Sequence, residues 1–112
     1  MAPTPLTPAV FHILLSLAGG ERHGYGILKD VLQHTDGQVR LGPGTLYGTL
    51  QRLMDAAWVE ESPRRAATAD ERRRFYRLTR VGKLALEAEV QRMERLVTHA
   101  RSRPVSAKAS RN

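Results

Sequence analysis

Glycine and proline divide the first half of this chain into three short segments, and this division most constrains what the chain can fold into. Gly-Gly at residues 19–20 ends the first segment, Asp-Gly at residues 36–37 ends the second, and Leu-Gly-Pro-Gly at residues 41–44 precedes the third. Within each segment apolar residues recur at helical spacing. The sequence therefore predicts three short amphipathic helices in succession.

The starts of these helices carry recognisable signals. Thr7 followed by Pro8 is typical of an N-cap with proline in the first turn. A second helix is expected from Gly24 to about His34, with His23 at its start. The third follows residues 41–45 and carries apolar residues at i, i+4, i+7 and i+8, which are Leu46, Leu50, Leu53 and Met54. The three leucines are expected to be core.

Two extended segments and a long helical run follow the three helices. Trp58 opens a segment that ends at residues 62–63, and residues 74–78 form a second segment rich in aromatic side chains. This pair predicts a β-hairpin with a long, basic tip, and Trp58 is expected to pack under it. Thr79 is expected to cap a final helix that runs to about Arg101.

The final helix carries a narrow apolar seam of the kind that pairs with another helix. Its members are spaced 4, 3, 4 and 3 residues apart, and they are Leu86, Val90, Met93, Val97 and Ala100. We interpret the seam as a dimer interface, although packing against the chain's own domain is an alternative. Leu84 is expected to face inward. The acidic residues Glu87, Glu89 and Glu94 are expected to be solvated.

In this order the elements predict a mainly α fold with a small β-hairpin, namely a winged helix-turn-helix with a long C-terminal dimerisation helix. Residues 1–79 would form the DNA-binding domain, residues 80–101 the dimerisation helix of the same domain, and residues 102–112 a disordered basic tail. A length of 112 residues suits one domain.

Positive charge is concentrated in the second half of the chain. Residues 1–62 carry 4 Lys and Arg against 6 Asp and Glu, whereas residues 63–112 carry 14 against 5. Such asymmetry is typical of a protein that binds a polyanion. The hairpin tip would act as a wing beside DNA, where arginine is favoured in narrow minor grooves. The alternative is a solvated loop. The candidate wing contacts are Arg64, Arg65, Arg72 and Arg73.

The third predicted helix takes the place of the helix that enters the major groove in helix-turn-helix proteins. Small residues there would let the backbone approach the groove, and hydroxyl and guanidinium groups can contact phosphates or bases. For Tyr47 a core position is the alternative, because its neighbours are apolar. The candidate DNA contacts of this helix are Gly44, Thr45, Tyr47, Gly48, Thr49 and Arg52.

Several function classes have little support. The chain has no Cys, which excludes disulfides, thiolate metal sites and Cys nucleophiles. Its histidines lack the short spacing of a metal site, so neither a metal nor a cofactor is expected. No catalytic triad, phosphate loop or carboxylate pair can be assembled, so an enzyme is not expected. Because no apolar run reaches about 18 residues and no secretory signal is present, a cytoplasmic location without a membrane partner is expected.

Several motifs carry a resemblance to a known family. They are Leu-Thr-Pro-Ala-Val-Phe-His-Ile-Leu-Leu at residues 6–15, His-Gly-Tyr-Gly-Ile at residues 23–27, Gly-Pro-Gly-Thr-Leu-Tyr at residues 42–47 and Arg-Arg-Phe-Tyr-Arg-Leu-Thr at residues 73–79. In this order and spacing the chain resembles the PadR-like transcriptional regulators, specifically the short members that lack a separate C-terminal domain. The similarity extends from Leu6 to about Leu96.

The resemblance implies a repressor that binds an inverted-repeat operator as a homodimer and releases DNA when a small effector binds or the dimer geometry changes. It implies that Tyr25 and Lys29 contact phosphates from the second helix, and that Thr45 and Tyr47 make contacts from the third. A dimer would set two such helices about 34 Å apart, which predicts a palindromic operator. The alternative is a winged helix that binds an acidic protein partner.

Overall fold

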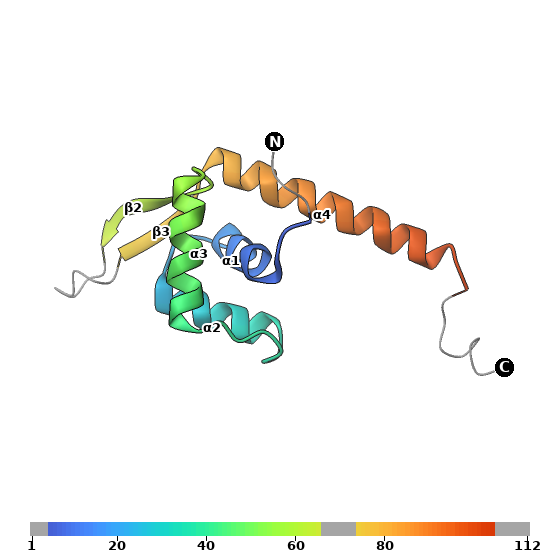
Figure 1. Ribbon diagram of the computed structural model, residues 1–112, viewed down its shortest axis with the longest axis horizontal. Coiled ribbons are helices and arrows are strands. Elements are labelled where there is room, and N and C mark those ends of the chain that lie inside the picture. The colour runs from blue at the N-terminus through green and yellow to red at the C-terminus, as the bar shows by residue number, and fades with distance from the viewer. Residues whose placement is uncertain (1–4, 66–73, 105–112) are drawn as a thin grey trace.

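The computed structural model describes residues 5–65 and 74–104, apart from the side chains of residues 64 and 65. The short helices gather at one end of a long C-terminal helix, with a small sheet beside them (Figure 1). In chain order the elements are α1 (Pro8–Ala18), β1 (Arg22–His23), α2 (Gly24–His34), α3 (Pro43–Asp55), β2 (Val59–Arg65), β3 (Arg74–Leu78) and α4 (Arg80–Arg101). Within the described residues no helix is long and apolar enough to cross a membrane.

Each helix begins where a side chain or a proline suits its first turn. Thr7 and Thr79 cap α1 and α4 with their hydroxyl groups, as predicted. His23 caps α2, because its Nδ1 accepts a hydrogen bond from the Gly26 amide at 3.0 Å. α3 begins at Pro43, whose missing N–H would have no helical partner in the first turn. The four predicted helices are confirmed.

The hairpin belongs to a three-stranded antiparallel sheet with the order β1-β3-β2. β2 and β3 pair in the register Val59↔Leu78, and the register shifts between Glu61 and Arg65. Pro63 lies in this irregular stretch, where it does not have to donate to the ladder. The hairpin was predicted from the sequence, but β1 was not, because a strand of two residues is too short to show alternation.

One hydrophobic core joins the first three helices, the sheet and the first half of α4. Full burial of each large aliphatic side chain stabilises such a core by about 1.5–3 kcal/mol. The three leucines of α3 that were predicted to be core are part of it. Its buried residues are Ile13, Leu14, Leu17, Ile27, Val31, Leu46, Leu50, Leu53, Val59, Tyr76, Leu78 and Leu86.

α4 consists of a half that belongs to this core and a half that extends past the rest of the chain (Figure 1). Leu86 packs in the core and is 7% exposed, so the prediction that it lies in a dimer interface is wrong. Leu84 is 55% exposed, so the expectation that it faces inward is also wrong. The two positions are about 200° apart around the helix and therefore cannot share one face. From Glu94 to the end of α4 every residue is exposed.

Glu89 is a buried carboxylate and not the solvated residue that was expected. It is 2% exposed, and it accepts two hydrogen bonds from Arg92, at 2.9 and 2.8 Å. These bonds hold the pKa of Glu89 below its ordinary value. The Leu6 amide also donates to Glu89, at 3.2 Å. Glu89 thereby fixes the N-terminal arm against α4.

The junction between β3 and α4 is closely packed. The Thr79 amide donates to the carbonyl oxygen of Trp58 at 3.0 Å. A Cβ at Gly82 would collide with the same carbonyl oxygen, so only glycine allows this approach. Trp58 itself is partly buried and packs against the core. It lines a groove together with residues of the N-terminal arm, α1 and α3.

Candidate nucleic-acid interface

α2 and α3 form a helix-turn-helix pair, and one face of α3 lies outside the core. Residues that repeat every three or four positions share a face of a helix. The buried residues of α3 are Leu46, Thr49, Leu50 and Leu53. Five of the six predicted contacts of this helix are exposed, and they are Gly44, Thr45, Tyr47, Gly48 and Arg52. Two further residues, Gln51 and Asp55, are also exposed and were not predicted.

Thr49 does not lie on this surface, and the prediction that it contacts DNA is wrong. Its side chain is 0% exposed, because position 49 lies between Leu46 and Leu53 on the core side of the helix. Its Oγ1 accepts a hydrogen bond from Arg52 Nη2 at 3.2 Å. Thr49 therefore holds the Arg52 guanidinium along α3.

Tyr47 connects α3 to the start of α2 while remaining on the surface. Its side chain is 48% exposed, which excludes the core position that was the alternative. A Cβ at Gly24 would collide with the Tyr47 hydroxyl group, so the glycine makes room for the phenol. Tyr47 thus belongs both to the exposed face and to the contact between the two helices.

Tyr25 and Lys29 lie one turn apart on the exposed side of α2. Tyr25 is 60% exposed, and the Lys29 ammonium lies 5.5 Å from the centroid of the Tyr25 ring, within the range of a cation–π contact. The His23 ring is nearly parallel to the Tyr25 ring, with 6.5 Å between centroids. The start of α2 therefore presents an aromatic and cationic surface.

The sheet supports the base of the wing through ion pairs. Arg77 Nε donates to Glu60 at 2.8 Å, and Arg77 Nη1 lies 3.6 Å from Glu21. The hydrogen bond to Glu60 raises the pKa of Arg77 above its ordinary value. Two of the predicted wing contacts, Arg72 and Arg73, lie outside the described residues. The other two, Arg64 and Arg65, lie at the end of β2, but their side chains are outside the described part of the chain.

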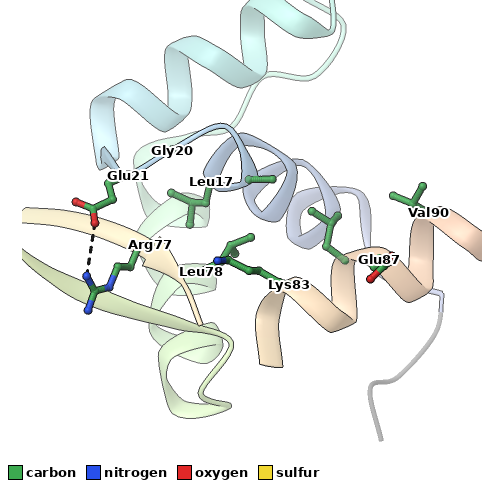
Figure 2. A pocket seen from close by; sticks show the side chains of 10 residues that line it. Leu17, Gly20, Glu21, Arg77, Leu78, Lys83, Glu87 and Val90 are labelled. Carbon is green, nitrogen blue, oxygen red and sulfur yellow. Dashed lines mark ion pairs between the residues drawn. The ribbon is translucent and has the colours of Figure 1, made fainter. Parts of the chain in front are cut away.

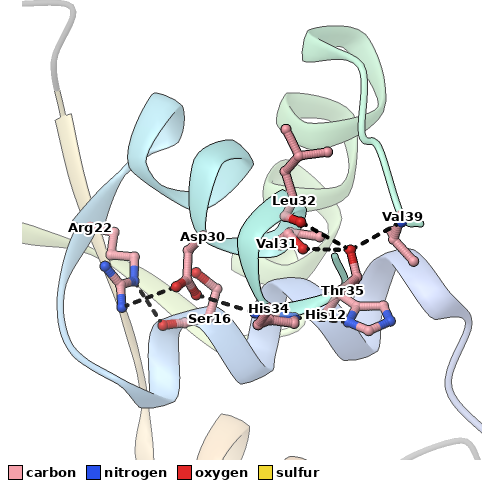
Figure 3. Close-up of polar contacts among 9 residues, drawn as sticks. All are labelled: His12, Ser16, Arg22, Asp30, Val31, Leu32, His34, Thr35 and Val39. Atoms are coloured by element: carbon pink, nitrogen blue, oxygen red, sulfur yellow. Dashed lines mark hydrogen bonds and ion pairs between the residues drawn. The ribbon is translucent and has the colours of Figure 1, made fainter. Parts of the chain in front are cut away.

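The fold brings together two histidines, one on α1 and one at the end of α2, whose contact was not predicted from the sequence. His12 Nδ1 and His34 Nε2 are 3.1 Å apart although 22 positions separate them (Figure 3). Asp30 lies 3.5 Å from His34 and 3.7 Å from Arg22, which donates to the Ser16 carbonyl at 3.0 Å. Burial and the neighbouring His34 lower the pKa of His12. Among the side chains described, no group of three or more could hold a metal ion.

A cavity of about 530 Å³ lies between the end of α1, β3 and α4 (Figure 2). Its volume is in the range of small-molecule sites. Its apolar walls are formed by Leu17, Ala18, Leu78, Leu86 and Val90, and its charged side chains are Glu21, Arg77, Lys83 and Glu87. The cavity therefore borders both the sheet and the first half of α4.

These elements together define the class of protein. A helix-turn-helix with an exposed second helix, followed by a β-hairpin, is the winged helix-turn-helix of DNA-binding proteins, so the predicted fold class is confirmed. The PadR-like sequence profile matches residues 13–88, and the chain belongs to this family of transcriptional regulators. The family consists of DNA-binding regulators and not of enzymes.

Three proteins illustrate the similarity. "Transcriptional regulator Rv3488" of Mycobacterium tuberculosis is 38% identical over 87 residues, which are 76% of this chain and 75% of that protein. An uncharacterised 37.1 kDa protein of transposon TN4556 from Streptomyces fradiae is 38% identical over 84 residues, and this chain spans only 22% of its length. A PadR family transcription regulator from Clostridium difficile has the same fold, with a TM-score of 0.70, 23% identity, and coverage of 86% of this chain and 97% of that chain.

Proposed function

We propose that the protein is a repressor that binds a palindromic operator as a homodimer and releases it when a small effector binds. The observation that carries the DNA-binding geometry is the exposed face of α3. The repressor role rests on membership of the PadR-like family. The dimer and the effector rest on separate features of α4 and of the cavity beside it.

The two glycines of α3 support a close approach to DNA. Among the described residues, and apart from the adjoining residues and the backbone of α3 itself, no atom lies within 4 Å of a Cβ built at Gly44. At Gly48 only the end of the Arg52 side chain comes that close, at 4.0 Å. Internal packing therefore requires neither glycine, although Gly48, which lies inside the helix, costs about 0.5–1 kcal/mol relative to alanine. A major groove pressed against this face accounts for both.

α2 and α3 would share the contacts to the phosphate backbone. α3 would lie in the major groove, while the start of α2 would lie against the adjacent backbone. Arg52, held by Thr49, would extend along the same face. The proposed contacts are Tyr25, Lys29, Gly44, Thr45, Tyr47 and Arg52, together with the wing residues Arg64, Arg65, Arg72 and Arg73.

The free half of α4 supports the homodimer. Leu96 is 53% exposed and Val97 is 50% exposed, although both are large apolar residues. A groove of about 540 Å³ between α1 and α4 is lined by Phe11, Met93 and Val97, among others. A second copy offers the same apolar face and closes both grooves by two-fold symmetry. The proposed interface is Val90, Met93, Val97 and Ala100.

This arrangement retains the proposed division of the chain into residues 1–79, which bind DNA, and residues 80–101, which dimerise. The first half of α4 also completes the core. The basic tail predicted for residues 102–112 lies outside the described residues from residue 105 onward.

The cavity between α1, β3 and α4 supports release by an effector. It combines apolar walls with charged groups, as small-molecule sites commonly do. A ligand there would touch both the dimerisation helix and the strand that leads from the wing. Because it would favour one arrangement of the two subunits in the dimer, it would change the affinity for DNA.

The first test is selection from a random pool of duplex DNA near physiological salt. We expect an enriched palindrome whose half-sites lie about 34 Å, one DNA turn, apart. Recovery of no enriched sequence, or binding of an acidic protein without DNA, would favour the alternative of a protein-binding winged helix.

A pair of lysine variants tests the orientation on that operator. Lys29→Ala removes a proposed phosphate contact, and Lys83→Ala removes a lysine at the cavity as a matched control. We expect Lys29→Ala to lower affinity and to reduce the slope of log K against log salt by about 0.9, the value for one phosphate. Lys83→Ala should leave the slope unchanged. An unchanged slope in Lys29→Ala would remove the start of α2 from the interface.

A further inference from the structure

We propose that Gln51 reads an adenine in the operator and that Asp55 fixes the direction in which the Gln51 amide points. This inference rests on the proposed function, in which α3 lies in the major groove. Neither residue is among the DNA contacts predicted from the sequence.

Gln51 is the first long side chain on the midline of the exposed face of α3. Gly44, Gly48, Gln51 and Asp55 are separated by 4, 3 and 4 residues, so they form one line along the helix. The two glycines leave the first part of this line without side chains. A base edge that approaches the helix there meets Gln51 next.

The hydrogen bond to Asp55 determines the orientation of the Gln51 amide. Gln51 Nε2 donates to Asp55 Oδ1 at 3.0 Å. An ionised carboxylate can only accept hydrogen bonds, so the amide must turn its NH₂ group and not its oxygen toward Asp55. Without such a partner the two orientations of a glutamine amide are nearly equivalent.

The groups left free on Gln51 are complementary to adenine. One amide hydrogen is used by Asp55, which leaves the second hydrogen and the carbonyl oxygen side by side. In the major groove adenine offers an N6 donor to that oxygen and an N7 acceptor to that hydrogen. Guanine offers two acceptors, so the Gln51 oxygen would face a second oxygen. The orientation fixed by Asp55 therefore favours adenine over guanine.

The same arrangement explains a carboxylate on a surface that approaches phosphates. Asp55 lowers the affinity for every DNA sequence, because its negative charge repels the backbone. As a positioning residue it raises the preference for one base. Its removal should therefore change affinity and specificity in opposite directions, which a purely structural role would not do.

Selection from a random duplex pool tests the reading of adenine. The wild-type chain is compared with Gln51→Met, which keeps the shape of the side chain but removes its amide, and with Gln91→Met, a matched control on the exposed side of α4. We expect all three to enrich the same palindrome. Wild type and Gln91→Met should prefer adenine over guanine by roughly 5- to 150-fold at one position of each half-site, and Gln51→Met should lose that preference.

Asp55→Asn then tests the positioning role. The asparagine oxygen can accept a hydrogen bond from the Gln51 NH₂ group, and the asparagine NH₂ group can instead donate one to the Gln51 oxygen, so both amide orientations are allowed. We expect tighter binding to all sequences and a smaller adenine preference. An unchanged set of base preferences in Gln51→Met overturns the reading by Gln51, while the wild-type palindrome would still support the proposed function. An unchanged adenine preference in Asp55→Asn overturns the role of Asp55. Thermal unfolding of each variant confirms that it is folded.

Discussion

Gly48 weakens the helix that carries it. A glycine inside a helix has more conformational freedom to lose on folding than alanine. Among the described residues, only the end of the Arg52 side chain, at 4.0 Å, comes near the space that a Cβ at position 48 would fill. Gly82 shows the opposite case, since a Cβ there would meet the Trp58 carbonyl. The space at Gly48 is therefore available to a partner, whereas the space at Gly82 is used by the fold.

Gly48→Ala should make the protein more stable and a weaker DNA binder. We expect the free energy of unfolding to rise by about 0.5–1 kcal/mol, because alanine favours the helix and has room there. Operator affinity should fall, since the added methyl group keeps the groove at a distance. Denaturant unfolding and operator titration measure the two effects, with Gly82→Ala as a contrast that should destabilise. Unchanged affinity in a stabilised Gly48→Ala would show that the groove does not need this space.

Single residues are also where sequence reasoning reached its limit. The leucine spacing of α3 identified its buried side, yet it did not separate Thr49, which the core covers, from the exposed Gln51. Glu89 shows the same limit, because the Leu6 amide that it binds is 83 positions away. Burial of a polar side chain depends on partners that are distant in the sequence, and local patterns do not contain them.

At the scale of elements, α1 and α2 are joined by the contact between His12 and His34. The two rings stack with 5.3 Å between centroids, and the Asp30 carboxylate lies 3.5 Å from His34 Nδ1. Burial and the neighbouring imidazole both disfavour a positive charge on His12. Protonation of His12 at low pH therefore disfavours the contact between α1 and α2, the helix that precedes α3.

The stability of the protein should decline as the pH falls below about 6.5, the ordinary pKa of histidine. Because the pKa of His12 is lowered in the folded state, the unfolded chain binds more protons in this range. This proton binding stabilises the unfolded chain and therefore lowers the free energy of unfolding. The contribution of neutral His12 to stability is complete above that pH, and it is lost progressively as the pH falls toward the lowered pKa. Urea unfolding between pH 5 and 8 should show a shallower decline in His12→Phe than in wild type. His99→Phe, at the exposed end of α4, should behave as wild type does.

Elements with local signals were the ones the sequence could predict. Thr7, His23 and Thr79 mark helix starts through bonds that span three residues, so their pattern is visible in the sequence. β1 carries no such signal, because its two residues become a strand only through pairing with β3. The packing that requires Gly82 is likewise invisible in the sequence, because the Trp58 carbonyl that approaches it lies 24 positions away.

At the scale of the whole molecule, α4 connects the DNA-binding domain to the proposed partner. Its first half supplies Leu86 to the core, and its second half presents Leu96 and Val97 to the outside. The apolar seam predicted from the sequence therefore serves two surfaces in succession. The periodicity of the sequence indicated one continuous apolar stripe along α4. The structure divides this stripe, because its first part packs in the core and its last part extends past the domain.

Val97→Glu should convert the dimer to a monomer, whereas Leu84→Glu should not. The two side chains are nearly equally exposed, at 50% and 55%, but they lie on different sides of α4. A charge at Val97 would be buried against the partner, while one at Leu84 would remain in water. Sedimentation of both variants distinguishes them, and the monomer should bind a half-site but lose its preference for the palindrome. Dissociation of Leu84→Glu alone would place the interface on the opposite face.

The junction at Thr79 and Gly82 has a consequence for the DNA that such a dimer accepts. Because the Thr79 amide and the space at Gly82 are both occupied by the Trp58 carbonyl, the sheet and α4 meet without slack. The distance between the two α3 helices of the dimer, and their rotation relative to each other about the DNA axis, would then be fixed. Two extra base pairs at the centre of an operator turn one half-site by about 70° around the DNA axis. A chain joined in this way has no linker with which to follow that turn, so operator spacing becomes a property of the protein's own geometry.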